Sequence, residues 1–291
     1  MKVAKKRQLF GIGVDSARMG EVLGIVCGWV EERRQRKAVG MRMIATAYSE
    51  SMLEALEDPG FRRALERSDL VLADGVSVAA ALDFVSAPRS EVWGWGWVVD
   101  LLRGLSVGLG ILQGRYRGQT VVGVELMENL IKEAGREGWK VMLAGGFGDE
   151  ASRLGEKLRT KDSRLQVASV AGPADLCMAT EAEKKALVGE VNRFSPDLLF
   201  VAFGRFKQEK WLADNRTRLK VGVAVGVGSA FDELLGVGGW RKVPDWVTGS
   251  GLKWLWRVGF DWKHFKRAWR AFPVFPLMVF KEHRKLGSLL F

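Results

Sequence analysis

Cysteine is scarce in this 291-residue chain, because only Cys27 and Cys177 occur and they form no CxxC pair. Two distant cysteines argue against a disulfide scaffold and a zinc site, and they fit a reducing cytosol. Histidine is equally scarce, and His264 and His283 are too few for an imidazole-based metal site. HExxH, GxSxG and Walker motifs are missing as well, so metalloprotease, serine-hydrolase and P-loop chemistry have no support.

A long uninterrupted apolar segment is also missing. The amino-terminal stretch MKVAKKRQLFGIGVDS is basic but has neither an apolar h-region nor a small-residue cleavage site, so we expect no signal peptide. Residues 88–119 contain WGWGW and an apolar run, but Asp100, Arg103 and recurrent glycines make a transmembrane helix a poor interpretation. We expect an insertion that binds a membrane surface or a partner, and a buried Gly-rich hairpin is the alternative.

Positive charge dominates the composition. The chain has 45 Lys and Arg residues against 34 Asp and Glu, a formal charge of +11 and a pI near 9.8. This excess favours anionic partners such as nucleic acid, phosphorylated metabolites or an acidic membrane. Residues 251–291 mix Lys and Arg with Trp and Phe, which predicts amphipathic helices lying on an anionic membrane surface. RNA binding by stacking is the alternative, but without an RNA-binding motif we expect no nucleic-acid partner.

Short apolar segments alternate with amphipathic ones between residues 7 and 228. We expect strands at 7–14, 41–47, 69–75, 139–146, 165–172, 197–204 and 220–228. We expect helices at 17–34, 50–58, 60–68, 124–136, 148–159, 180–193 and 206–214. This alternation predicts an α/β fold, a Rossmann-like and mostly parallel sheet with helices on both faces. The predicted domains are a core of residues 1–250 and a basic, Trp-rich helical appendage of residues 251–291.

Polar residues and glycines follow several of these strands, where an open parallel sheet binds its ligands. The candidate site residues are Thr46, Tyr48, Asp74, Gly145, Gly146, Lys207, Gln208, Glu209 and Asp232. The Gly145–Gly146 pair could present N–H groups to a phosphate, or serve only a tight turn. Asp74 could instead cap a helix that starts near Ser77. GVGSAF (226–231) is an incomplete dinucleotide-binding motif and carries no prediction.

Several segments resemble, in order and at the correct spacing, the motifs of one protein family. They are GIGVDSARMGEVLGIV (11–26), TAYSE (46–50), LADGVSV (72–78), VVGVELMENL (121–130), VMLAGGFGDEA (141–151), FGRFKQEKW (203–211), VGVGSAFDELLG (225–236) and KVPDWVTGSGLKWLWR (242–257). The resemblance runs from about residue 8 to residue 270, apart from the insertion at 88–119. On these motifs the chain resembles the WecG/TagA/CpsF bacterial glycosyltransferases (glycosyltransferase family 26).

The resemblance implies an inverting enzyme of cell-surface polysaccharide synthesis. Such an enzyme moves an N-acetylmannosamine-type sugar from a UDP-sugar to undecaprenyl-diphosphate-linked N-acetylglucosamine, and we expect no metal cofactor. Asp74 matches the base that takes the proton of the acceptor hydroxyl. Lys207 would offset phosphate charge, Gln208 would bond a uracil or sugar amide, and Glu209 would bond the pocket or support its backbone.

The resemblance also gives the appendage a place in the active site at the membrane. The family's appendage arginines map onto Arg257, His264 and Arg267, and we expect Arg257 and Arg267 to reach the diphosphate of the substrate or lipid. We therefore expect a cytoplasmic protein bound peripherally to the inner face of the cell membrane. A homo-oligomer is compatible with the sequence.

Six positions depart from the family pattern. They are Tyr48 for Asn, Thr120 for Arg, Glu125 for Asp, Phe206 for Pro, Lys253 for Glu and His264 for Arg. Because Tyr48 and Thr120 fall where substrate contact is expected, a changed donor or acceptor is one interpretation, with Arg115 or Arg117 replacing the lost guanidinium. A non-catalytic membrane scaffold is the other, although retention of Asp74 and the K-Q-E turn argues against it.

Overall fold

The computed structural model describes residues 5–35, 40–88, 90, 95–116, 118–173, 175–237 and 269–285, and an eight-stranded sheet forms its centre. The strands are β1 (Lys5–Leu9), β2 (Ile12–Ser16), β3 (Arg42–Ala47), β4 (Leu70–Ala73), β5 (Lys140–Gly145), β6 (Gln166–Val170), β7 (Leu198–Ala202) and β8 (Val223–Gly226). Their order is β1-β2-β4-β3-β8-β7-β5-β6, and only β1 and β2 pair antiparallel. The predicted mostly parallel sheet is confirmed.

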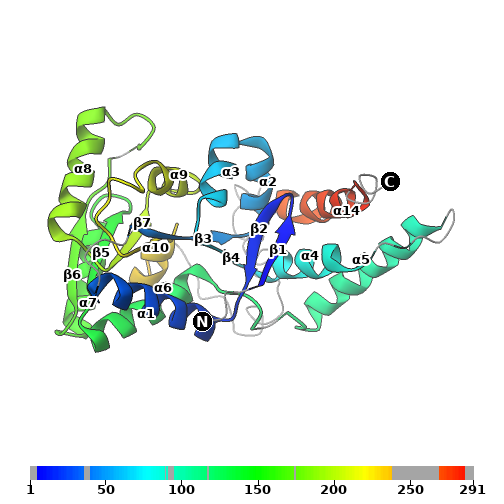
Figure 1. Cartoon of the computed structure of the whole chain (residues 1–291), viewed down its shortest axis with the longest axis horizontal. Helices are drawn as coiled ribbons and strands as arrows, with labels where there is room; N and C mark the ends of the chain where they lie inside the picture. Colours follow the sequence, from blue (N-terminus) through cyan, green and yellow to red (C-terminus); the bar gives the residue numbers. More distant parts are fainter. Residues whose placement is uncertain are drawn as a thin grey trace.

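Helices cover both faces of the sheet, as the sequence predicts (Figure 1). In the described part of the chain they are α1 (Met19–Gln35), α2 (Ser49–Glu57), α3 (Pro59–Glu66), α4 (Val76–Ser86), α5 (Gly96–Leu112), α6 (Gly123–Glu137), α7 (Glu150–Lys161), α8 (Glu181–Phe194), α9 (Lys207–Asp214), α10 (Ala230–Leu235), the π-helical turn η2 (Arg270–Val274) and α14 (Phe275–Lys285). Helices α1, α6, α7 and α10 share one apolar cluster with the sheet, and α8 and α9 share another.

Strand β3 shows how the sequence produces this layering. Met43, Ile44 and Ala45 are consecutive, and all three are fully buried. Ile44 packs with α1 and α6 on one face, whereas Met43 and Ala45 pack with helices of the other face. Since successive side chains of a strand point to opposite faces, a strand covered on both sides must be apolar at every position.

The amino-terminal strand predicted at 7–14 is wrong in its boundaries. The chain forms two strands there, β1 and β2, which pair antiparallel from Leu9↔Ile12 outward. Phe10 and Gly11 make the turn with φ of 53° and 74°, the left-handed pair that a two-residue hairpin requires. Because Phe10 is itself buried, the apolar pattern runs through the turn without a break.

The insertion predicted at 88–119 contains a helix, so the alternative of a buried Gly-rich hairpin is wrong. Helix α5 packs along α4, and the two form an arm that extends from the sheet (Figure 1). A Cβ on Gly104 would lie 3.7 Å from the Phe84 ring, an ordinary contact distance, so the two helices touch at this point. No helix among the described residues has the length and apolar content that a membrane span needs.

Helix α14, near the carboxyl end, packs into the core. Phe275 and Val279 are buried in the same apolar cluster as residues of β1, β2 and α4. The chain bends at Phe272, whose φ and ψ are not helical, and Pro273 follows. Pro276 does not end a helix, because it lies in the first turn of α14, where no backbone N–H is needed.

Candidate functional site

Thr46 and Asp74 lie together at the carboxyl edge of the sheet. Thr46 belongs to β3, and Asp74 follows β4 and donates its backbone N–H to the Ala47 carbonyl, 2.8 Å away. Both side chains face the first residue of α6, because a Cβ on Gly123 would lie 3.7 Å from Asp74 Oδ2 and 3.8 Å from Thr46 Oγ1. The amino terminus of α6, which is the positive end of the helix dipole, therefore lies beside the Asp74 carboxylate.

The helix-cap alternative for Asp74 concerns the start of α4. Helix α4 begins at Val76, and Gly75 occupies its N-cap position with φ of 116°. Asp74 therefore precedes the N-cap residue of α4 by one position. The half-buried Asp74 carboxylate remains the candidate base.

Tyr48 is the N-cap residue of α2, and its ring stacks on Phe206 with ring centroids 6.3 Å apart. Burial raises the pKa of the Tyr48 phenol, and the Arg205 guanidinium opposes that rise. Arg205 also forms an ion pair with Glu50, in the first turn of α2. Tyr48 is therefore held between α2 and the turn before α9, where the family pattern has asparagine and proline.

The K-Q-E turn begins α9, and its three side chains have different surroundings. Lys207 is half-buried, and its Nζ pairs with Asp175 Oδ1 at 2.7 Å, which raises the pKa of the lysine. Gln208 is buried; it accepts from the Gly228 N–H at 3.1 Å and donates to Glu209 Oε1 at 2.9 Å. Gln208 therefore joins α9 to the turn after β8.

Glu209 is the buried carboxyl group of this turn. Its Oε1 accepts from Gln208, while Oε2 has no hydrogen-bond partner among the described residues. Burial raises the pKa of Glu209 to about 7, and the bond from Gln208 limits the rise. Its position against Gly226 explains the glycine there, because a Cβ on Gly226 would lie 2.7 Å from Glu209 Oε1.

The Gly145–Gly146 turn after β5 has φ values of 96° and 82°, which few other residues adopt. A Cβ on Gly145 would lie 2.7 Å from the Ala202 carbonyl oxygen. The Gly146 N–H donates to that same carbonyl at 2.9 Å, and the Phe147 N–H donates to Glu150 Oε2 at 2.7 Å. These two amides are engaged within the protein, so the steric alternative accounts for the glycines.

Asp232, on α10, is hydrogen-bonded to Glu150 on α7. Burial, together with the hydrogen bond and negative charge of Glu150, raises the pKa of Asp232 to about 6. The sequence analysis missed Glu150 and also Phe147, whose ring is 79% exposed at this edge. The signal in the sequence was GGFGDE, in which an aromatic residue stands between glycines and two acidic residues follow.

The remaining predicted residues are placed only in part. Arg257, Arg267, Lys253 and His264 lie outside the described residues, as does Arg117.

Thr120 lies near the candidate base, because the next residue, Val121, donates to the Ala73 carbonyl at 2.9 Å. Arg115 instead pairs with Asp83 near the far end of α4, at 3.8 Å, so it does not replace a guanidinium beside Asp74.

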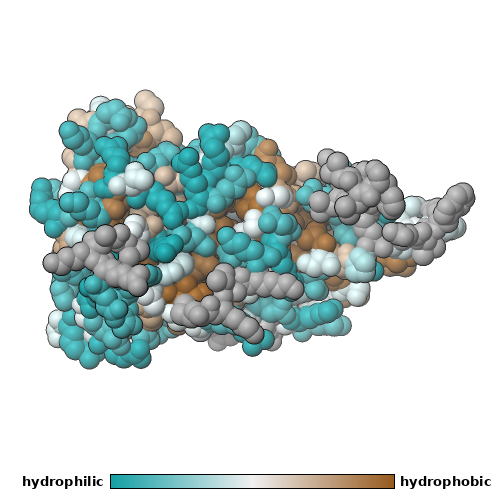
Figure 2. Space-filling view, in the orientation of Figure 1, coloured by the Kyte–Doolittle hydropathy of each residue, from teal (hydrophilic) through white to brown (hydrophobic). Residues whose placement is uncertain are grey.

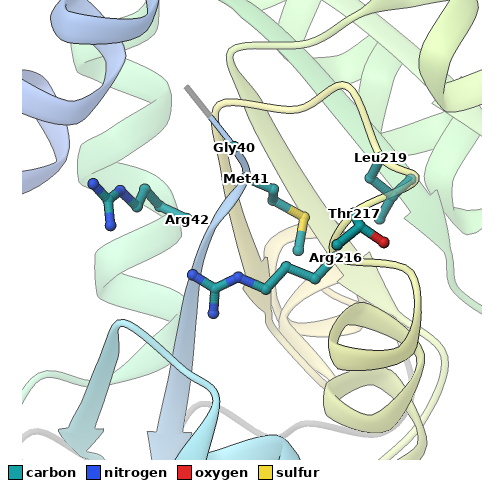
Figure 3. A pocket seen from close by; sticks show the side chains of 6 residues that line it. All are labelled: Gly40, Met41, Arg42, Arg216, Thr217 and Leu219. Atoms are coloured by element: carbon teal, nitrogen blue, oxygen red, sulfur yellow. The ribbon is translucent and has the colours of Figure 1, made fainter. Parts of the chain in front are cut away.

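A cavity of about 310 Å³ lies at the opposite, amino-terminal edge of the sheet, lined by Gly40, Met41, Arg42, Arg216, Thr217 and Leu219 (Figure 3). Arg42 Nη1 and Arg216 Nη2 both donate to the Asp69 carboxylate, at 2.9 and 2.7 Å. Both guanidinium groups of this cavity are paired with the Asp69 carboxylate. We therefore place the anion-binding site at the carboxyl edge of the sheet and not in this cavity.

Comparison with known proteins identifies the family. The family model described as "Glycosyl transferase WecG/TagA/CpsF family" matches residues 7–106 and 103–288. N-acetylglucosaminyldiphosphoundecaprenol N-acetyl-beta-D-mannosaminyltransferases from Staphylococcus aureus strains NCTC 8325, COL and MRSA252 are each 26% identical over 184 residues, which cover 62% of this chain and 69% of the relative. The chain therefore belongs to the glycosyl transferase WecG/TagA/CpsF family.

Proposed function

We propose that this glycosyltransferase moves an N-acetylmannosamine-type sugar from a UDP-sugar to undecaprenyl-diphosphate-linked N-acetylglucosamine, during synthesis of a cell-surface polysaccharide. The names of the S. aureus relatives support the sugar and the lipid acceptor. The observation that carries the proposal is the convergence of Thr46 and Asp74 on the first turn of α6. This arrangement places one carboxylate and one hydroxyl beside a helix N-terminus, at the edge where parallel sheets bind ligands.

The proposed reaction is a single displacement. The acceptor hydroxyl oxygen attacks the anomeric carbon, its proton passes to the Asp74 carboxylate, and the bond from that carbon to the UDP oxygen breaks with inversion. The departing diphosphate gains negative charge, which the amino terminus of α6 is placed to offset. Arg257 and Arg267 would add positive charge. We propose that no metal ion is required, and transfer should persist in excess EDTA.

The departures from the family pattern bear on the donor. Tyr48 and Phe206 form one aromatic contact, so the pocket wall next to the K-Q-E turn differs from one with asparagine and proline. A different N-acetylated UDP-hexose is therefore the second candidate donor. The chemistry at Asp74 is unchanged in that case.

We propose that the enzyme acts at the inner face of the cell membrane, where it reaches the lipid-linked acceptor from the cytoplasm. Residues 251–291 would hold the protein there by basic and aromatic side chains.

A transfer assay tests the function. The full chain is incubated with vesicles that carry the lipid-linked acceptor and with a panel of UDP-sugars, and the product is identified by mass. We expect one N-acetylated UDP-hexose to be consumed. The product should have the anomeric configuration opposite to that of the donor, which is a β-linkage for an α-linked donor. No transfer from any UDP-sugar, together with no thermal shift by UDP, would instead support the non-catalytic scaffold.

A further inference from the structure

The outward face of α5 is apolar and carries no charge. Its exposed large side chains are Trp97, Val99, Leu101, Leu102, Leu105, Leu109 and Leu112. Leu102 and Leu105 are 60% and 59% exposed, and Trp95, just before the helix, is 67% exposed. Such a continuous strip is larger than the scattered exposed leucines of ordinary protein surfaces.

The polarity of α5 is the reverse of that of a helix on a water-soluble core. The buried residues of the helix are Gly96, Asp100 and Gly110. Asp100 is fully buried, and Arg284 Nη1 of α14 lies 3.0 Å from its Oδ2, while His283 Nε2 lies 3.6 Å from its Oδ1. Rotation of α5 to bury its leucines would expose Asp100 and break these contacts, so the ionic contacts fix the outward direction of the leucines.

Exposed apolar side chains also occur on the segment that packs beside the arm. Trp269, Phe272 and Leu277 are 55–59% exposed, and α14 contacts both α4 and α5. Figure 2 shows apolar surface, in brown, in the region where these helices lie. Cationic groups accompany it: Lys281 is exposed one turn after Leu277, and Arg115 is exposed beyond the end of α5.

We propose that the outward face of α5 inserts into the interface of an anionic lipid bilayer, as a monotopic contact separate from residues 251–268. Leucines with tryptophans at one end, no charge on the inserted face and cations beside it match the pattern of an interfacial helix. A second copy of the chain fits less well, because among the exposed side chains of the strip only the Ser106 hydroxyl is polar and could fix a register.

The position of the arm suggests a role for the bilayer contact in catalysis. This role rests on the proposed function. Helix α4 starts directly after Asp74, and the chain after α5 returns to β4 at Val121. Both ends of the arm are therefore attached beside the candidate base. A bilayer bound to α5 would hold the carboxyl edge near a lipid-linked acceptor.

Vesicle sedimentation of the full chain tests the proposal without substrate or nucleotide. The variant Leu101→Gln/Leu105→Gln/Leu109→Gln is compared with Ser106→Gln, which adds an amide to an exposed position of the same helix and keeps the leucines. Vesicles of phosphatidylcholine with about one-third phosphatidylglycerol are used in 0.15 M and 0.5 M salt, since salt weakens the electrostatic part. We expect the triple variant to bind at least about tenfold more weakly, most clearly at high salt, and Ser106→Gln to bind like wild type.

Equal vesicle binding by the triple variant and wild type would overturn the proposal. If the triple variant also changed a dimer into a monomer in size-exclusion chromatography while its vesicle binding stayed unchanged, a second copy would be the occupant instead. The thermal shift caused by UDP reports separately on the proposed function. Weak vesicle binding by the triple variant together with no UDP response in wild type would retain the bilayer contact and reject the transferase.

Discussion

The rings of Tyr48 and Phe206 lie 6.3 Å apart and within 18° of parallel, although the two residues come from different strand ends. Both replace other residues of the family pattern, asparagine and proline. The φ of Phe206 is +66°, which proline cannot adopt. The two departures are therefore linked in the structure. Phe206, whose backbone is left-handed, stands where the family pattern has proline. Its ring stacks on Tyr48, which stands where the pattern has asparagine.

A double-mutant cycle should detect this coupling. Tyr48→Asn and Phe206→Ala should each destabilise the protein, and the pair should cost less than the sum by about 0.5–1.5 kcal/mol. Free energies of unfolding from urea titrations supply the measurement. Strict additivity would mean that the rings are neighbours without energetic contact. Phe206→Pro should be worse than Phe206→Ala, because its φ is incompatible.

Replacement of the candidate base should separate chemistry from binding. Asp74→Asn keeps the shape of the side chain but cannot accept the acceptor proton, so turnover should fall about 10²–10⁴-fold while the UDP thermal shift persists. Asp149→Asn is the control, since that carboxylate is exposed at the same edge of the sheet. Turnover of Asp74→Asn within threefold of wild type would remove Asp74 from the mechanism.

Glu209 should give stability a recognisable pH dependence. Its folded-state pKa is raised from 4.5 to about 7, so the folded state binds a proton that the unfolded state releases. The resulting stabilisation is complete below pH 4.5 and is lost as pH rises through 7. Between pH 5 and 8, wild type should lose about 2–3 kcal/mol of unfolding free energy relative to Glu209→Gln. Parallel pH profiles of the two proteins would show that Glu209 has an ordinary pKa.

Gln208 has two roles to separate. Its bonds to Gly228 and Glu209 predict that Gln208→Ala lowers the unfolding free energy by about 1–3 kcal/mol, because buried partners lose a hydrogen bond. Contact with the nucleotide-sugar predicts a loss of similar size in UDP-sugar binding. Calorimetry of binding at a temperature where the variant is folded distinguishes them. Unchanged affinity with lowered stability would assign Gln208 to structure alone.

Helix α14 should be required for folding of the core. Phe275→Ala removes a side chain that is 2% exposed and should cost about 3–5 kcal/mol, whereas Leu277→Ala, 58% exposed on the same helix, should change stability by less than about 0.5 kcal/mol. Thermal unfolding of both variants checks this. Equal melting temperatures would show that the carboxyl segment is separable from the core.

The parallel sheet could be predicted because its strands are apolar on both sides, as at Met43, Ile44 and Ala45. The β1–β2 turn could not, since buried Phe10 hides the break. The place of Asp74 at the sheet edge followed from the end of an apolar run. The hydrogen bond from the Gly146 N–H to the Ala202 carbonyl could not be predicted, because Ala202 belongs to a strand that lies far away in the sequence.

Helix α5 was the hardest element to predict. Its leucines have helical spacing, but the recurrent glycines also allowed the buried hairpin that was the alternative. What decides its orientation is Asp100, whose partners Arg284 and His283 come from the other end of the chain. Long-range ion pairs of this kind are not visible in a local pattern.

The arm leaves β4 through Asp74 and returns to the same strand at Val121, so its two ends are anchored at almost one place. An insertion with adjacent ends can be lengthened or shortened without displacing the structure that carries it. The 17 residues of α5 span about 25 Å at the usual helical rise. Evolution can therefore adjust the reach of the arm by whole helical turns while the spacing of Thr46, Asp74 and Gly123 stays constant.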